Sequence, residues 1–527
     1  MWNIRLYDLN IGIFPEKEEI KVKSKIHVNV KDRDRIILAL NESLNVSDLF
    51  VDGRKVSFKI EKGKLAEYFP FNYTIISVDE ELTAGTHVID MAYSGVFQGY
   101  RKYSKAFWGG VSEIGAFMRC DEIWYPVKAE DPMSDYRKPQ AKAKIKVKVP
   151  KEYRVFANGR YEGKKELENK DEYTYIIDYP APLTLVAAKY VIKSDNEFKL
   201  AVFPKHENEI IQKFLKIIGI SLNKLKELYE KLPFSPITIA ELPKGYHGYS
   251  APYLILFDED FLTYSTLEEV DAVYKLSHEL SHLWWGWYLR ASPFTPGGIW
   301  LNESIADYSS ILVVEKIYGY NRAVKYLEEA RSLYLNPWSK HPDYPRDYVP
   351  LKEPPISTIT IENAGYSWEP VRHGKGPWIY HMLRYILGLE TLIDVLRELI
   401  RRKGGREITL DDFLNVLYEK TNINIDWFIE EWIRGNALPI YSVDVLAILK
   451  ENGKYNLDIL IQNKGTGAMP LDIQVICKEG VVNKRVWIGS RDSVETRIIC
   501  PSKPKKIMLD PNNYILKSYR SKLTESI

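Results

Sequence analysis

The spacing of apolar residues changes twice along the chain, and this feature limits the possible fold more than any other. Up to about residue 195 apolar and polar residues alternate, as around Val28 and Val30, which is typical of strands with one buried face. Residues 208–434 show helical spacing, and residues 440–527 return to alternation. The chain has 527 residues, too many for one hydrophobic core. We therefore expect separate β, mainly helical and β regions.

The changes in spacing predict three domains. They are an N-terminal β-domain at residues 1–195, a mainly helical domain at 196–438 and a C-terminal β-sandwich at 439–527. In the first domain Asn158-Gly159 is a signal for a hairpin turn, and in the third domain Asn452-Gly453 is another. A short apolar strand is expected at Ile237–Ala240. The predicted helices lie at 208–231, about 267–287, about 300–318, 376–403, 409–420 and 426–434.

Composition excludes several classes of protein. Lys and Arg number 73 and Asp and Glu 71, so the net charge of +2 does not attract nucleic acid or an anionic membrane. Lysine stripes in the first domain therefore indicate a solvated strand face. We find no apolar run of 18 residues and no signal peptide at the start, which favours a cytoplasmic protein without a membrane partner. No sequence pattern indicates the oligomeric state.

Two residue counts bear on environment and stability. The three cysteines, Cys120, Cys477 and Cys500, are too few for a disulfide scaffold or a cysteine zinc cluster. We expect free thiols, with a Cys477–Cys500 disulfide as the alternative. Glutamine occurs only five times, whereas charged residues make up 27%. Few thermolabile amides among many charges indicate a heat-adapted, thermophilic protein, which a melting temperature in the mesophile range would contradict.

The strongest chemical signal is His278-Glu279-Leu280-Ser281-His282, inside a predicted helix. Positions i and i+4 share one helical face, so both imidazoles can reach one metal ion. Glu279, next to the first histidine, can direct its carboxylate to a water on that ion. The alternative is two core histidines beside a glutamate whose hydrogen bonds are satisfied.

The third ligand is expected to be a carboxylate. Position 288 is Tyr, which excludes the three-histidine metzincin pattern. Glu303 begins the next predicted helix, after the Pro/Gly-rich loop at 292–298, and two antiparallel helices would bring it to the histidine pair. Asp307 lies one turn further on the same face. Asp307 could orient a histidine ring or be a plain surface carboxylate, and the sequence leaves both interpretations open.

These motifs resemble a known family. The segment HELSHLWWG at 278–286, followed by WLNES at 300–304, is similar to the aminopeptidase N and leukotriene-hydrolase family of gluzincin metallopeptidases, which show His-Glu-x-x-His-x-Trp-x-Gly and then Trp-Leu-Asn-Glu-Gly. WYP at 124–126 with EDP at 130–132, and Lys375-Gly376, are similar to further family segments. The resemblance covers most of residues 1–440. It implies a multi-domain α+β fold with a saddle-like N-terminal β-domain, a thermolysin-like, mainly α catalytic domain and a C-terminal β-sandwich.

The chain also departs from the family pattern. Between His282 and Glu303 there are 20 residues where the family usually has 18, and the loop at 292–298 can hold the excess. The family strand Gly-Ala-Met-Glu-Asn, whose Glu binds the free amine of the substrate, corresponds to residues 248–255, which contain no acid. The family's catalytic Tyr is displaced. Alignment on Lys375-Gly376 places His373 at its position, with Tyr366 and Tyr380 nearby as substitutes and a solvated loop histidine as the alternative.

Together the residues and the resemblance predict a zinc metallopeptidase with one Zn²⁺ per chain and peptides as substrates. His278, His282 and Glu303 would hold the ion, and Glu279 would act as the base. His373, Tyr366 or Tyr380 would stabilise the oxyanion. Three functions stay open. They are an aminopeptidase in which Glu241 or Glu113 binds the amine, an endopeptidase or peptidase of altered specificity, and a non-catalytic scaffold.

Overall fold

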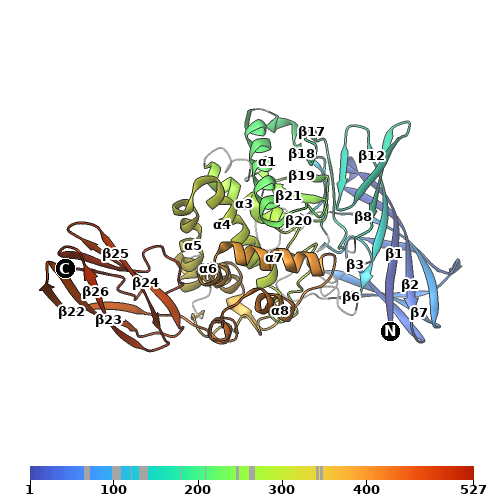
Figure 1. The fold of residues 1–527 in the computed structure, drawn as a ribbon. Coiled ribbons are helices and arrows are strands. Elements are labelled where there is room, and N and C mark those ends of the chain that lie inside the picture. Colours follow the sequence, from blue (N-terminus) through green and yellow to red (C-terminus); the bar gives the residue numbers. More distant parts are fainter. Residues whose placement is uncertain are drawn as a thin grey trace. The chain divides into compact units, whose positions relative to one another are not determined.

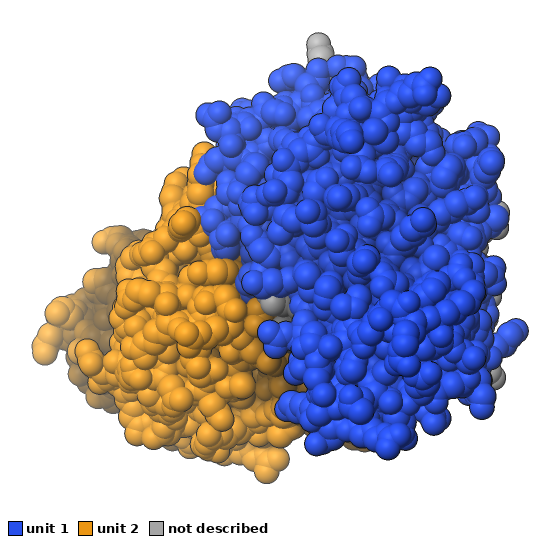
Figure 2. Space-filling model, turned by 90° about the vertical axis from the view of Figure 1, so that its right-hand side faces the viewer, with its two compact units in different colours: residues 1–221, 232–272 blue, residues 222–231, 273–527 orange. Residues whose placement is uncertain are grey.

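The computed structural model in Figure 1 describes residues 1–63, 72–97, 109–119, 122–129, 141–179, 181–207, 209–244, 248–259, 261, 268–339, 344 and 348–527. The chain forms two compact units. Unit 1 consists of residues 1–221 and 232–272 and unit 2 of residues 222–231 and 273–527, coloured blue and orange in Figure 2. Cys120 and residues 130–132, which the sequence analysis singled out, lie outside the described residues.

Unit 1 contains an eight-stranded sheet in the order β14-β15-β12-β1-β2-β8-β4-β5. Its alternating pattern buries one face, as in Leu9, Val22 and Val147, and leaves the other face polar. β1 runs antiparallel to β2 and parallel to β12. The strands are β1 (Trp2–Phe14), β2 (Glu19–Val30), β4 (Asn45–Val51), β5 (Arg54–Lys55), β8 (Gly85–Val96), β12 (Lys142–Pro150), β14 (Arg160–Glu166) and β15 (Lys170–Ile177).

Two four-stranded sheets share a hydrophobic core with the eight-stranded sheet. Their orders are β11-β3-β7-β6 and β13-β16-β10-β9. Leu38 and Ile76 from the first, and Met118 from the second, belong to the same buried cluster as Leu9 and Val22. The strands are β3 (Asp34–Asn41), β6 (Phe58–Gly63), β7 (Tyr73–Leu82), β9 (Gly110–Val111), β10 (Gly115–Met118), β11 (Val127–Lys128), β13 (Arg154–Ala157) and β16 (Leu185–Ala188).

The hairpin predicted at Asn158-Gly159 is wrong. These residues do separate β13 from β14, but β13 pairs with β16 whereas β14 pairs with β15. The buried Asn158 amide donates to the Pro182 carbonyl at 2.7 Å and accepts from the Thr184 N–H at 2.9 Å. Its hydrogen bonds therefore hold a crossing between two sheets and do not close a local turn.

Unit 1 also holds a five-stranded sheet in the order β17-β18-β19-β21-β20. Its central strands β18, β19 and β21 are parallel, and helix α1 (Glu209–Tyr229) connects β18 to β19, as parallel neighbours require. The predicted helix and strand in this stretch are confirmed. The strands are β17 (Val191–Ser194), β18 (Phe198–Val202), β19 (Ile237–Leu242), β20 (Tyr249–Ala251) and β21 (Leu254–Asp258).

The helical stretch continues from α3 onward. Its elements are α3 (Glu269–Ser281), the π-helical turn η4 (Trp300–Ser304), α4 (Ile305–Tyr318), α5 (Tyr320–Leu335), the 3₁₀ turn η6 (Gly365–Ser367), the π-helical turn η7 (Pro370–Lys375), α6 (Gly376–Leu387), α7 (Leu389–Lys403), α8 (Leu410–Lys420), α9 (Asp426–Phe428) and the π-helical turn η8 (Ile429–Ile433). None of the helices among the described residues combines the length and the hydropathy needed to cross a bilayer.

Two predicted helices differ from the structure at glycines, and one helix of the structure was not predicted. The helix expected to reach Trp287 ends at Ser281, because Gly286 has φ +117° and the chain turns away before it. The helix expected at 376–403 is two helices, because Gly388 at φ +85° separates α6 from α7. Helix α5 was not expected. The helices expected at 300–318, 409–420 and 426–434 are confirmed.

The C-terminal residues form the expected β-sandwich, with sheets in the orders β22-β23-β26 and β25-β24-β27-β28. Asn452 and Gly453 have φ values of +49° and +78° and close the β22–β23 hairpin, as predicted. Cys477 and Cys500 are buried free thiols. The strands are β22 (Tyr441–Glu451), β23 (Lys454–Asn463), β24 (Met469–Cys477), β25 (Val481–Ile488), β26 (Ser493–Cys500), β27 (Pro504–Leu509) and β28 (Thr524–Ser526). The domain boundaries at 195 and 438 stay predictions.

Candidate metal centre

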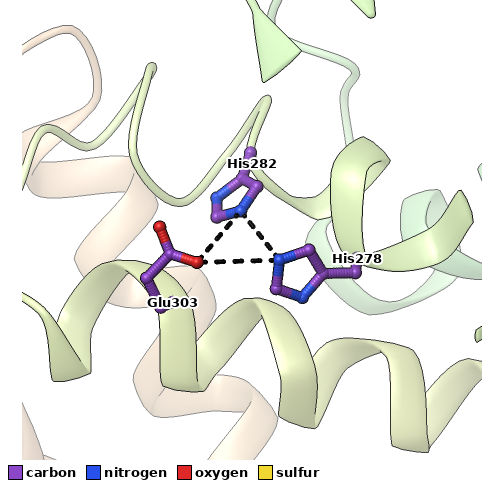
Figure 3. Close-up of side chains that lie close together, drawn as sticks. All are labelled: His278, His282 and Glu303. Atoms are coloured by element: carbon purple, nitrogen blue, oxygen red, sulfur yellow. Dashed lines mark hydrogen bonds and ion pairs between the residues drawn. The ribbon is translucent and has the colours of Figure 1, made fainter. Parts of the chain in front are cut away.

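His278 and His282 lie one turn apart at the end of α3, and each ring has one nitrogen already engaged. His278 Nδ1 is 2.9 Å from Asp307 Oδ1, and His282 Nδ1 is 2.9 Å from the carbonyl oxygen of Trp285. A carboxylate and a carbonyl only accept hydrogen bonds, so each Nδ1 carries a hydrogen and donates it. In the neutral rings each Nε2 then presents a lone pair. The two Nε2 atoms lie 3.1 Å apart and face each other, as Figure 3 shows.

Glu303 completes a triangle with the two imidazoles. Its Oε2 lies 3.7 Å from His278 Nε2 and 3.7 Å from His282 Nε2. A point equally distant from the three atoms is about 2.0 Å from each of them, which matches Zn–N and Zn–O bond lengths. The three side chains are only 11–17% exposed. Two lone pairs and a carboxylate oxygen that converge in a shielded place fit a divalent cation, and the donor set fits zinc.

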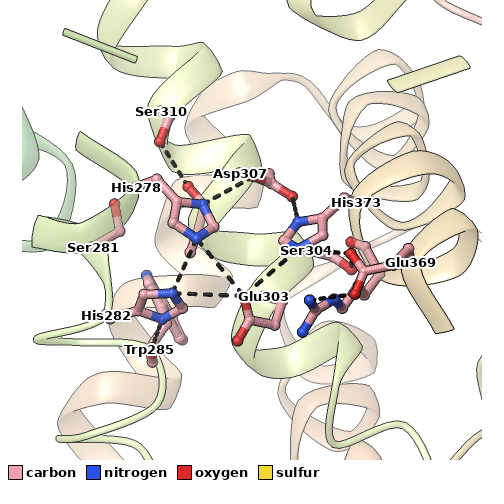
Figure 4. Close-up of polar contacts among 12 residues, drawn as sticks. His278, Ser281, His282, Trp285, Glu303, Ser304, Asp307, Ser310, Glu369 and His373 are labelled. Carbon is pink, nitrogen blue, oxygen red and sulfur yellow. Dashed lines mark hydrogen bonds and ion pairs between the residues drawn. The ribbon is translucent and has the colours of Figure 1, made fainter. Parts of the chain in front are cut away.

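Asp307 lies behind this triangle and holds two histidines at once (Figure 4). Its Oδ1 accepts from His278 Nδ1, and its Oδ2 accepts from His373 Nδ1 at 2.6 Å. The Tyr274 hydroxyl also donates to Oδ1 at 3.2 Å. Asp307 is 5% exposed, so it is not a surface carboxylate. This contact is the kind of outer hydrogen bond that fixes the orientation and tautomer of a metal-binding imidazole.

The charges of the site depend on one another. Burial raises the pKa of Asp307, but His373 and His278 outweigh this effect and hold that pKa well below its usual range. Burial likewise opposes ionisation of Glu303, yet His282 and His278 lower its pKa well below the ordinary value. The pKa of Glu279 is raised, because burial outweighs the attraction of His278 and His282. Glu303 and Asp307 are thus anionic, as metal binding and ring orientation require.

Comparisons with known proteins place this arrangement in a family. A sequence profile of the peptidase family M1 domain matches residues 249–432, which contain His278, His282 and Glu303. Residues 249–432 are thus similar to the peptidase family M1 domain. The resemblance to gluzincin metallopeptidases of the aminopeptidase N type is thereby confirmed.

The individual relatives are distant in sequence. The chain is 22% identical to aminopeptidase M1-B of Oryza sativa subsp. japonica over 426 residues, 75% of this chain and 46% of that protein. It is 21% identical to aminopeptidase O of Homo sapiens over 253 residues, 43% of this chain and 30% of that protein. It therefore spans about half or less of the length of these relatives.

Among solved structures, the fold is similar to that of Legionella pneumophila aminopeptidase A in complex with aspartic acid. The TM-score is 0.71 at 15% sequence identity, and the match covers 98% of this chain and 60% of that chain. A similarity at this identity concerns the fold alone. It confirms the predicted multi-domain architecture of β-sheet, helical and C-terminal sheet regions.

Two glycines let the segments of the M1 domain approach closely. A Cβ at Gly286 would lie 2.6 Å from Asn302 Oδ1 and 3.4 Å from His282 Nδ1. A Cβ at Gly376 would lie 1.9 Å from Ser304 Oγ, beside Glu303. These contacts explain why a glycine stands four residues after His282 and why another opens α6.

The structure brings only one of the three predicted oxyanion donors to the metal centre of the M1 domain. His373 on η7 lies with Nε2 4.0 Å from Glu303 Oε2. Tyr380 is fully buried, donates to the Trp300 carbonyl at 3.3 Å and stacks on the Trp300 ring at 4.4 Å. Tyr366 is 57% exposed, and its carbonyl accepts from the Tyr344 hydroxyl. The Tyr380 hydroxyl is therefore engaged elsewhere, and the contact of Tyr366 with Tyr344 involves only the Tyr366 main chain.

Four further residues contribute to the site without a sequence prediction. Tyr274 lies one turn before His278, a spacing that could have indicated it. The Trp285 carbonyl, which orients His282, follows from the end of α3. Arg372 donates to Glu369 at 2.5 Å beside His373, and no motif pointed to either residue.

The two acids considered for amine binding lie in unit 1. Glu241 on β19 is fully buried, and its carboxylate accepts from the Phe203 N–H at 2.7 Å and contacts His206 Nδ1 at 2.6 Å. Burial raises the pKa of Glu241 to about 8. Its carboxylate is thus enclosed and occupied. Glu113 is exposed between β9 and β10.

Proposed function

We propose that this protein is a zinc-dependent metallopeptidase in which Glu279 is the general base. The observation that carries the proposal is the convergence of two Nε2 lone pairs and Glu303 Oε2 in a shielded triangle. The family M1 domain around this triangle supports the same function. His278, His282 and Glu303 would hold the ion. When bound, zinc acts as a Lewis acid and lowers the pKa of a coordinated water toward 7.

The residues around the triangle would transfer the proton and stabilise the oxyanion. Glu279 accepts the proton of the attacking water and returns it to the leaving amine, a task for which a raised pKa is suited. Asp307 fixes the ring of His373 through Nδ1. Nε2, which lies 3.8 Å from Glu369 Oε2 and 4.0 Å from Glu303 Oε2, would donate to the developing oxyanion. The shielded position of these groups strengthens each interaction.

Replacement of Glu279 by Gln tests the proposal directly. The amide keeps the size of the side chain and cannot accept the proton. We expect unchanged zinc content by elemental analysis and a fall in kcat of about 10² to 10⁴-fold on peptide substrates. Glu362→Gln, an exposed change in the same unit, should leave both values unchanged. Full activity in Glu279→Gln protein would remove Glu279 as the base.

The mode of substrate recognition has two candidates. The aminopeptidases among the relatives favour an aminopeptidase. The enclosed Glu241 and the absence of an acid at residues 248–255 instead favour a peptidase that does not require a free amine. Rates on an aminoacyl-anilide and its N-acetylated form separate the two, because only an aminopeptidase loses activity on the blocked compound. Lack of activity on either one, with zinc bound, would favour the non-catalytic scaffold. The cytoplasmic location and heat adaptation stay predictions.

A further inference from the structure

The polar face of the eight-stranded sheet carries a row in which two lysines flank an asparagine. The register places Lys146 of β12 beside Asn10 of β1, and Asn10 beside Lys23 of β2. Paired residues of neighbouring strands point to the same face, and strands lie about 4.8 Å apart. The two lysine side chains therefore start about 10 Å apart, with the Asn10 amide between them.

A hollow of about 500 Å³ lies over this row. Small residues leave space for the hollow, because Gly12 is paired with Lys21 and Ala92 with Lys23. Ser47 and Ser94 add hydroxyl groups to its lining. The volume is within the range of about 300–1,000 Å³ that is typical of ligand pockets.

Lys23 and Lys146 differ from three of the lysines around them. These three have carboxylate partners at 3.4–3.5 Å, namely Lys21 with Glu19, Lys25 with Asp90 and Lys148 with Glu172. Over the residues that the structure describes, Lys23 and Lys146 have no ion pair. From Thr174 of β15 to Ala92 of β8 their row contains no acid, and the next residue in it, Asp48 of β4, is paired with Lys55. Two positive charges thus face one hollow without counter-charges.

We propose that this hollow binds an acidic, extended peptide segment. One carboxylate of the segment lies between the Lys23 and Lys146 ammonium groups and accepts from the Asn10 amide. Residues two apart in an extended chain are separated by about 6.8 Å, which is also the spacing of Lys21 from Lys23 along β2. A second acidic residue therefore reaches Lys21 and Lys148 in the next row. This site is independent of the proposed peptidase activity.

The lining favours a peptide over a single-stranded nucleic acid. Binding of unpaired bases relies on exposed aromatic rings on which the bases stack. The only aromatic side chain in the described lining of the hollow is Tyr93, which is 2% exposed with its ring in the core. The hollow offers charge, amide and hydroxyl groups, which suit carboxylates.

Binding of a fluorescein-labelled octamer of D-glutamate to the full chain tests the proposal, because a peptidase does not readily cleave D-peptides. Fluorescence anisotropy gives Kd at 25 mM and 150 mM NaCl. We expect saturable binding that weakens about tenfold or more in K23Q/K146Q protein. The control K59Q/K62Q removes two exposed lysines from β6 and should change Kd less than about twofold.

Other outcomes overturn the proposal. Equal weakening by the two double variants would show attraction to overall charge and no specific site. An oligothymidine octamer that binds more tightly, and loses binding in K23Q/K146Q protein, would assign the hollow to nucleic acid. N10D supplies a second measurement, because a carboxylate at the floor should abolish binding through like-charge repulsion. Thermal unfolding curves matching those of the wild type exclude misfolding in each variant.

Discussion

Asp307 contacts two histidines to which our proposal gives different roles. One oxygen accepts from His278, a metal ligand in the proposal, and the other accepts from His373, the proposed oxyanion donor. A carboxylate can serve both rings because each of its oxygens accepts hydrogen bonds, whereas any other side chain of this size would offer fewer acceptors. The orientation of the ligand and that of the oxyanion donor are therefore linked through one residue.

Replacing Asp307 by Asn should weaken metal binding. The amide has one acceptor oxygen, so only one of the two Nδ1–H groups keeps its partner. We expect zinc affinity to fall about 10- to 100-fold, as measured by competition with a chromophoric chelator. The control His373→Gln removes the other partner of Asp307 and should leave zinc affinity close to that of the wild type. An unchanged affinity in Asp307→Asn protein would contradict the orienting role.

At the scale of elements, the end of α3 positions the second histidine. The helix stops before Gly286, and the turn that follows brings the Trp285 carbonyl to His282 Nδ1. Two π-helical turns play a comparable part, because η4 carries Glu303 and η7 carries His373. Such irregular turns are frequent at functional sites, where they rotate side chains away from regular helical positions.

Gly286→Ala tests the importance of this turn. Alanine at φ +117° is strained by about 1–3 kcal/mol, and its Cβ would also collide with Asn302 Oδ1. Gly319→Ala is a matched control, because its φ of +86° gives comparable strain with no atom within 4 Å of the Cβ. Denaturant unfolding should show a greater loss of stability for Gly286→Ala, together with weaker zinc binding. Equal losses in both variants would contradict the close-contact argument.

Local patterns predicted the part of the site that α3, η4 and α4 supply. His278 and His282, and likewise Glu303 and Asp307, are one helical turn apart, so periodicity placed each pair on one face. His373 lies 66 residues from Asp307, and no periodicity reports a contact over that distance. Family alignment suggested His373, Tyr366 and Tyr380 as oxyanion donors, and only the packing in the structure shows which of them lies near the metal ligands.

The hairpin predicted at Asn158-Gly159 was wrong because the flanking strands pair with different partners, and this pairing overrides the local turn preference.

On the scale of the whole molecule, the ligands proposed for zinc all belong to unit 2. They come from two segments joined by the loop at 292–298, and their contacts with Asp307 and His373 add a third segment, η7. An ion held there would bind only the folded chain, because the three donors converge only when these segments pack. Metal binding therefore contributes to the stability of the folded state.

Removal of metal should lower the melting temperature. At a free zinc concentration 100 times Kd, binding adds about 2.7 kcal/mol to stability. For a unit of this size we expect a fall in Tm of about 5–10 °C on treatment with a chelator, reversed by zinc, in differential scanning calorimetry. His278→Ala/His282→Ala protein is the control and should not respond. A chelator effect of the same size in that variant would show that the stabilising ion binds elsewhere.

The two opposed imidazole nitrogens have a practical consequence for anyone who purifies this protein. A pocket of two nitrogens and one oxygen does not discriminate strongly among first-row transition ions, and nickel and copper bind such donors at least as firmly as zinc. What sits between the rings in a given preparation will therefore reflect the chromatography resin and buffer. Assays are best begun from stripped protein reloaded with one defined ion.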